Sequence, residues 1–315
     1  MLKILRSWTL PISMFTGAMV YFIFSQIDGL NPAKPYIYSF ISYITPSLIF
    51  AQLLLTFCKI SVRELMPVKW HGWLLLIQLF TSLLLVALLL AIPMRDEYRA
   101  LFEGAMVCLI CPTATAAAVI TGKLGGSASS LTTYTLLSNL LAALLVPFLF
   151  PLVEPHADIT FFKAFLIILG KVFPLLLFPF FLALFLKRFI PSIHQFLAGL
   201  KDLAFYLWAI ALSIVTGQTV KSLVNSEADI AVELMITLAG LATCIMQFYL
   251  GKRIGSKYND RISAGQALGQ KNTILAIWMS YTYLNPLASV APGSYVLWQN
   301  FFNSYQLWKK TRKEV

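Results

Sequence analysis

The stretch Gly265-Gln266-Ala267-Leu268-Gly269-Gln270-Lys271-Asn272-Thr273 interrupts an otherwise apolar segment, Ile262–Tyr283. That segment has the length of roughly 20 residues that a helix needs to cross the hydrocarbon core of a bilayer. Its glycines weaken the helix in the middle, and the Lys271 amine lies too deep to reach the interface easily. Irregular backbone and charge are tolerated at that depth only where protein or a wet cavity surrounds them. The stretch therefore predicts a broken transmembrane helix at a functional site.

A second apolar segment, Ala100–Thr121, contains Cys111-Pro112-Thr113-Ala114-Thr115 near its middle. Proline removes a backbone donor and clashes with the preceding turn, so carbonyl groups of that turn lose their partners. This pattern favours a second broken helix. A simple proline kink, which is common in membrane helices, is the alternative interpretation.

The whole chain has the composition of a membrane protein. Its 315 residues are 59% hydrophobic and 12% charged, whereas soluble domains carry about 25% charged residues. Ten segments are long and apolar enough to cross a bilayer. They are Trp8–Ile27, Tyr36–Cys58, His71–Pro93, Ala100–Thr121, Ser130–Val153, Phe161–Leu186, Leu203–Val220, Ile230–Gly251, Ile262–Tyr283 and Leu287–Trp308.

The positive charges predict the orientation of these segments. One alternating set of loops holds 17 Lys and Arg residues, and the other set holds four: Lys34, Arg95, Arg99 and Lys221. Positively charged loops mark the cytoplasmic side of a membrane protein, so both termini are expected in the cytoplasm. The membrane is expected to be the inner (plasma) membrane of the cell. The net charge of +11 is explained by topology, and no nucleic-acid partner is expected.

The ten segments divide into two halves near Glu154–Thr160, residues 1–155 and residues 156–315. Each half contains five segments, and because five is odd, the second half enters the membrane with the opposite orientation to the first. The interrupted segments are fourth in each half, and matching interruptions in inverted repeats mark the binding site of secondary transporters. Coincidence is the alternative. The predicted fold is an all-α membrane protein of ten transmembrane helices in two inverted five-helix repeats, with helices 4 and 9 broken.

Other polar residues within the apolar segments are weaker candidates. Lys171 either lines a cavity or reaches the outer interface, and Gln78 is either a ligand or a helix-packing residue. Cys108 and Cys111 form a CxxC pattern without a second pair, which favours ordinary buried cysteines. No Asp or Glu lies in mid-membrane and the histidines do not cluster, so neither an enzyme nor a metal centre is expected.

Three parts of the chain resemble the bile acid:sodium symporter family. Cys111-Pro112 with Gly125-Gly126-Ser127 is similar to the family's fourth-helix motif, and Gly269-Gln270-Lys271-Asn272 is similar to its ninth-helix motif. Asn285-Pro286-Leu287-Ala288 and Trp298-Gln299-Asn300 are similar to motifs of its last hairpin. The resemblance implies a panel and a core subdomain, broken helices crossing in the core, two bound sodium ions, and an organic anion in the cleft between the subdomains.

The sodium positions that the resemblance implies are mostly substituted. The family's Ser-Asn pair falls on Ala117 and Ala118, and the next serine falls on Leu131. The acidic ligand falls on Ala267 and a glutamine falls on Lys271. Oxygen-bearing residues are retained only at the positions of Gln78, Thr135 and Asn272. We therefore expect no cofactor, and an ammonium in place of the ion.

The resulting prediction is a secondary transporter of small or amphipathic organic anions of the bile acid, pantoate or related carboxylate class. It works by alternating access, independently of sodium, with the lipid bilayer as its surroundings. The expected substrate-binding residues are Pro112, Thr113, Thr115, Asn272, Gln299, Asn300 and Lys171. The expected ion or ion-substitute site is Gln78, Thr135, Gln270 and Lys271. An anion channel and a non-transporting membrane receptor are the alternatives; the substrate, the coupling by protons or by no ion, and protein partners stay open.

Overall fold

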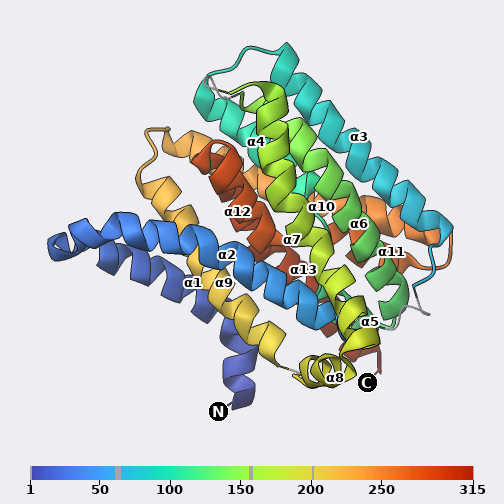
Figure 1. Cartoon of the computed structure of the whole chain (residues 1–315). Coiled ribbons are helices and arrows are strands. Elements are labelled where there is room, and N and C mark those ends of the chain that lie inside the picture. The colour runs from blue at the N-terminus through green and yellow to red at the C-terminus, as the bar shows by residue number, and fades with distance from the viewer. Residues whose placement is uncertain (1, 61–64, 156–158, 201, 315) are drawn as a thin grey trace. The chain divides into compact units, whose positions relative to one another are not determined.

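The computed structural model describes residues 2–60, 65–155, 159–200 and 202–314. Within these ranges the chain is helical apart from short connections, and no β-strand occurs (Figure 1). Arg63 and Lys201, two of the cations counted on the cytoplasmic side, lie outside the described residues. The described residues pack into two compact units, each assembled from two stretches of the chain.

The first unit comprises Met1–Ile60 and Pro174–Glu227. Its close helix contact is between Gly17 and Ser213, where a Cβ on Gly17 would collide with the Ser213 carbonyl. Small residues allow such close approach of membrane helices. Its elements are α1 (Leu2–Gln26), η1 (Asp28–Ala33), α2 (Lys34–Phe57), the later part of α7 (Phe161–Phe189), α8 (Pro191–Gly199) and α9 (Leu203–Val224).

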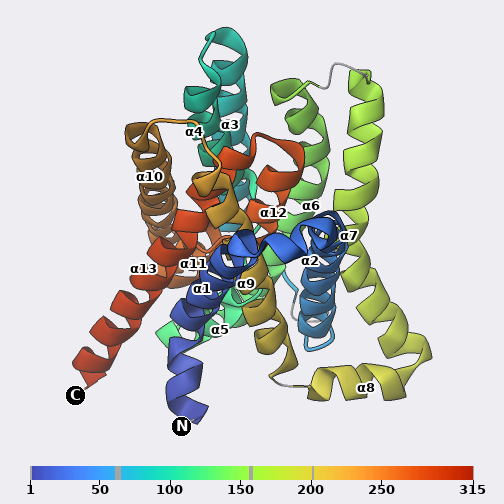
Figure 2. The same ribbon diagram turned by 90° about the vertical axis from the view of Figure 1, so that its left-hand side faces the viewer.

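The second unit comprises Ser61–Phe173 and Ala228–Val315. A buried cluster that includes Trp70, Leu131, Tyr134 and Leu268 joins its two stretches. Figure 2 shows these helices from the side. They are α3 (Lys69–Ala91), α4 (Asp96–Ile110), α5 (Ala117–Leu124), α6 (Ala128–Val153), the start of α7, α10 (Ile230–Ser256), α11 (Arg261–Gly269), α12 (Thr273–Tyr283), η3 (Pro286–Ser289) and α13 (Val290–Glu314).

Every predicted segment coincides with a helix or with a pair of consecutive helices. The two segments predicted to be interrupted are split, the first into α4 and α5 of 15 and 8 residues, the second into α11 and α12 of 9 and 11 residues. None of these pieces alone reaches the length of a membrane span. Among the described residues, six helices are long and apolar enough to cross a membrane. The all-helical prediction is therefore confirmed, and six of the ten predicted spans have the length and composition of membrane-spanning helices.

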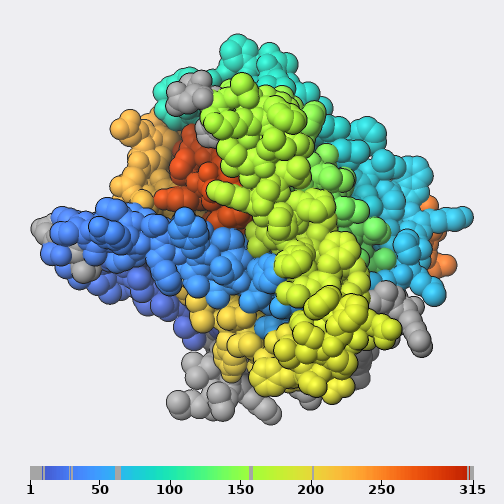
Figure 3. Space-filling model, in the orientation of Figure 1, coloured from blue at the N-terminus to red at the C-terminus, as the bar shows by residue number. Residues whose placement is uncertain are grey.

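The outer surfaces of the helices carry large apolar side chains. Phe178, Phe181 and Phe185 on α7 are each half or more exposed, and α7 forms part of the face seen in Figure 3. In water such a surface would be costly, whereas lipid accepts it. The one described α-helix that the sequence did not predict is α8, within a segment expected to be a cytoplasmic loop. Pro191 begins it, and none of its residues is buried.

Candidate functional site

The two helix breaks of the second unit meet and pair with each other. Thr113 and Lys271 form an antiparallel β-bridge. The Ala114 amide donates to the Gln270 carbonyl at 3.0 Å, and the Asn272 amide donates to the Pro112 carbonyl at 2.8 Å. Unwound backbone that is removed from water must find partners. Each break therefore satisfies part of the backbone of the other.

Pro112 explains why α4 ends where it does. Proline has no amide hydrogen, so the Cys108 carbonyl four residues earlier loses its helical partner. The Thr113 amide would continue the helix by donating to Leu109, but it donates to the Ser138 hydroxyl on α6 at 3.1 Å instead. The last carbonyl groups of α4 are consequently free to accept hydrogen bonds from other elements.

Three side chains from three different segments of the chain donate hydrogen bonds to these carbonyl groups. The Lys271 amine donates to the Leu109 carbonyl at 3.1 Å, and the side-chain amide of Gln247 on α10 donates to the Cys108 carbonyl at 3.2 Å. The side-chain amide of Gln78 on α3 donates to the Ile110 carbonyl at 2.7 Å. Lys271 is 1% exposed. Its ammonium therefore lies at the negative end of the α4 dipole, where a cation is stabilised.

The end of α11 is completed by neutral donors. The Thr113 hydroxyl donates to the Ala267 carbonyl at 2.6 Å, and the Tyr295 hydroxyl donates to the Gly269 carbonyl at 2.8 Å. Beyond the helix end, the Lys271 amide donates to the Gln299 side chain on α13 at 2.9 Å. The place where the two helix breaks meet, called the crossing below, thus combines a charged cap on α4 with uncharged caps on α11.

Two Gln–Tyr pairs flank the crossing. The Tyr134 hydroxyl on α6 lies 3.4 Å from the Gln78 side-chain oxygen, and the Gln247 side chain donates to the Tyr295 hydroxyl on α13 at 3.1 Å. In each pair the glutamine belongs to the third predicted segment of its half and the tyrosine belongs to the fifth.

The structure brings most of the predicted site residues to this crossing, namely Pro112, Thr113, Gln270, Lys271, Asn272, Gln299 and Gln78. Thr115 lies half-buried in the same break as Thr113. Thr135 is buried and its hydroxyl donates to Leu131 of its own helix. Asn300 likewise donates to Val296 of its own helix. Lys171 is exposed on α7, and no hydrogen bond or ion pair joins it to the crossing within the described ranges.

Sequence reasoning missed four residues that hold the crossing together: Gln247, Tyr295, Tyr134 and Ser138. Gln247 has the same signal as Gln78, a single amide within an apolar helix, so that signal was available. The tyrosines and the serine are common in membrane helices and give no such signal.

Comparison with known proteins adds one match. The family model described as the Sodium Bile acid symporter family matches residues 46–226, more than half of the chain. The matched range begins in α2 and ends just after α9, so it includes the first helix break and stops before the second. A search among curated proteins gave no match.

Proposed function

The chain belongs to the sodium bile acid symporter family, whose members are transporters and not enzymes. From this membership we propose that the protein is a secondary transporter of a small or amphipathic organic anion. Bile acids, pantoate and related carboxylates are the candidate substrates. The observation that carries this proposal is the meeting of two broken helices, the arrangement on which secondary transporters build their binding sites. Alternating access is the expected mode of transport.

The proposed architecture is ten spans in two inverted five-helix repeats, residues 1–155 and 156–315. The matching positions of the helix breaks and of the two Gln–Tyr pairs support it. In this topology both termini lie in the cytoplasm and the protein crosses the inner (plasma) membrane. The division into two compact units is compatible with a panel and a core subdomain.

We further propose that transport does not depend on sodium, because the residues at the family's sodium positions do not fit that ion. Ala117, Ala118, Leu131 and Ala267 offer no side-chain oxygen, and the Thr135 hydroxyl is engaged within its own helix. A hard cation needs several oxygen ligands, and the Lys271 ammonium would repel it. Lys271 itself donates to the α4 carbonyl that a cation could otherwise neutralise.

The proposed substrate site uses the polar groups around the crossing, Pro112, Thr113, Thr115, Asn272, Gln299 and Asn300; Lys171, exposed on α7, is a proposed substrate contact away from the crossing. The Asn272 side chain accepts a hydrogen bond from the Leu275 amide at 3.3 Å and so caps the start of α12. The positive ends of α5 and α12 and the Lys271 charge together favour an anion. Gln78, Thr135, Gln270 and Lys271 form the proposed site that replaces the ion.

Uptake of labelled pantoate and taurocholate into vesicles with purified protein tests both proposals. We expect saturable uptake and counterflow of at least one of the two compounds, at the same rate in sodium and in choline buffers. A strict sodium requirement contradicts sodium independence. Unitary currents without counterflow indicate an anion channel, and binding without uptake indicates a receptor; either result contradicts the transporter.

A further inference from the structure

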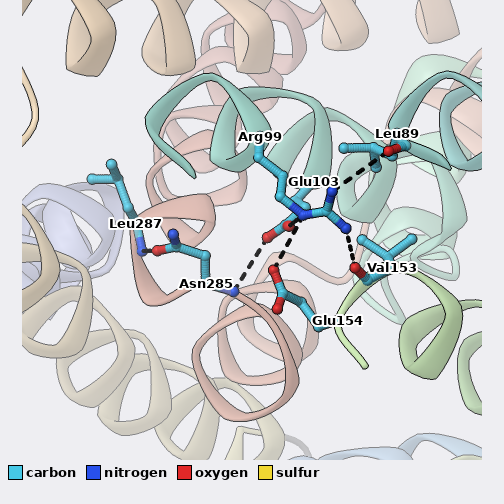
Figure 4. Close-up of polar contacts among 7 residues, drawn as sticks. All are labelled: Leu89, Arg99, Glu103, Val153, Glu154, Asn285 and Leu287. Atoms are coloured by element: carbon cyan, nitrogen blue, oxygen red, sulfur yellow. Dashed lines mark hydrogen bonds and ion pairs between the residues drawn. The ribbon is translucent and has the colours of Figure 1, made fainter. Parts of the chain in front are cut away.

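A second polar cluster lies in the second unit, where α3 turns into α4 and α6 ends (Figure 4). The Arg99 guanidinium is surrounded by two carboxylates, because its Nε lies 3.3 Å from a Glu103 oxygen and 3.5 Å from a Glu154 oxygen. Its other nitrogens donate to the carbonyl groups of Leu89 and Val153. A single cation is therefore divided between two acids and two backbone carbonyls.

Glu103 is the buried member of this cluster. Its side chain is 0% exposed, whereas Arg99 is 23% and Glu154 is 34% exposed. One Glu103 oxygen, Oε2, accepts from the Asn285 amide at 3.2 Å; the other, Oε1, is the oxygen that lies 3.3 Å from Arg99 Nε, and it accepts no hydrogen bond from the described residues. An ionised carboxylate that is removed from water is costly unless hydrogen bonds and opposite charge compensate it. Among the described residues, Glu103 has only one backbone amide and a guanidinium that it shares with Glu154, so the cost of burying its negative charge is compensated incompletely.

Arg99 and Glu154 of this cluster line a cavity of about 410 Å³, whereas the buried Glu103 is not part of its wall. Asp96 and Glu154 are the two acids of its wall, and Arg99 is the one cation among the described residues that line it. Tyr283 also lines this cavity; it is 8% exposed and its hydroxyl has no hydrogen-bond partner. The cavity thus combines an excess of negative charge with a buried hydroxyl that lacks a partner.

The charged and hydrogen-bonding groups that face Glu103 come from α4, from the end of α6 and from the turn between α12 and η3. Arg99 lies one turn earlier on α4, Glu154 lies at the end of α6, and Asn285 lies in the turn between α12 and η3. Arg99 and Glu154 are the charged groups that act on Glu103. Protonation of Glu103 leaves Arg99 paired with Glu154 alone and turns the buried carboxylate into a hydroxyl donor.

We propose that Glu103, Arg99 and Glu154 form a proton-binding site and that its proton is the coupling ion of transport. A hydronium ion in the cavity gives its proton to the Glu103 carboxylate: an O–H bond of hydronium breaks and leaves water, an O–H bond forms on Glu103, and the charge that paired with Arg99 is neutralised. Release of the proton returns the carboxylate to the ion pair with Arg99. The coupling role rests on the proposed transport function, whereas proton binding does not.

Infrared spectroscopy of the purified protein during a pH titration tests the proton site. We expect a protonated-carboxyl C=O band at neutral pH in the wild type and its loss in Glu103→Gln. In Glu154→Gln, Arg99 pairs with Glu103 alone and stabilises its ionised form, so the band should be weaker in that variant. Glu97→Gln is the matched control, since Glu97 belongs to the same end of α4 but pairs with the exposed Arg95 at 3.0 Å. A neutral-pH band that survives Glu103→Gln, or the absence of any band, overturns the site.

A pH-sensitive dye trapped in vesicles tests the coupling. Pantoate or taurocholate uptake by the wild type should move protons with the substrate, and Glu103→Gln should abolish that movement while substrate counterflow continues. Counterflow without proton movement in the wild type overturns the coupling. If neither compound is taken up, the proposed transport function fails, and the infrared titration still decides the proton site.

Discussion

At the scale of single residues, Lys271 is the decisive side chain of the crossing. It is buried, and its amine is held by the carbonyl group of Leu109 at the end of α4. A buried ammonium requires compensation, and the negative end of a helix with unpaired carbonyls supplies part of it. Lys271 therefore acts as a fixed cationic cap between two helices.

We expect Lys271→Met to destabilise the protein by about 1–3 kcal/mol, because the Leu109 carbonyl is left buried without a donor. Thermal unfolding of the purified protein in detergent measures this loss. Lys257→Met is the control, since Lys257 is exposed at the end of α10. A loss no larger than that of the control would contradict the role assigned to Lys271.

The sequence was sufficient to find the residues whose polarity conflicts with an apolar segment. Lys271, Asn272 and Gln78 were predicted on that ground, and the structure places them together. It left two interpretations open for Lys171, because the position of a residue along a helix does not say which way its side chain faces. That direction depends on which neighbouring helices pack on α7, and Lys171 is exposed there.

At the scale of elements, the break between α4 and α5 depends on one missing amide hydrogen. Pro112 deprives Cys108 of its helical partner, and Gln247 replaces that partner from α10. The bridge between Thr113 and Lys271 can form because the chain is unwound there. The break therefore depends both on Pro112 and on the neighbouring helices that satisfy the freed backbone groups.

We expect Pro112→Ala to lengthen α4 and to disturb the bridge, since alanine is about 3 kcal/mol more favourable than proline inside a helix. Vesicle uptake should fall to about a tenth of the wild-type rate, equivalent to roughly 1.4 kcal/mol in the barrier. Pro147→Ala, at a proline within the continuous helix α6, is the control and should retain uptake. Equal uptake by the two variants would show that the break does not depend on Pro112.

Sequence patterns predicted the helices well because membrane spans have a minimum apolar length, and Pro112 and the glycines near Lys271 marked both interruptions. They did not predict α8. A helix of nine residues is shorter than any span, and a segment with basic residues between two spans was interpreted as a loop.

At the scale of the whole molecule, the chain is a multi-pass membrane protein whose second unit holds both helix breaks. Its free cysteines, Cys58, Cys108, Cys111 and Cys244, are all buried. Thiol reagents that do not cross membranes should therefore leave the native cysteines unmodified in the folded protein. This makes added surface cysteines useful reporters of topology.

The proposed topology places Glu97 outside the cell and Lys257 in the cytoplasm. A membrane-impermeant maleimide applied to intact cells should label Glu97→Cys and should label Lys257→Cys only after permeabilisation. The unmodified protein is the control for background labelling. Labelling of both positions from the same side would rule out the proposed arrangement of spans.

The bridge between the two breaks has a consequence for how such proteins diverge. Its two hydrogen bonds, from Ala114 to Gln270 and from Asn272 to Pro112, join backbone atoms alone. The joint therefore needs no particular side chain to make its hydrogen bonds, although it needs Pro112 to keep the backbone unwound. We therefore expect that substitutions around the joint can exchange the coupling ion while the backbone that joins the two broken helices stays unchanged.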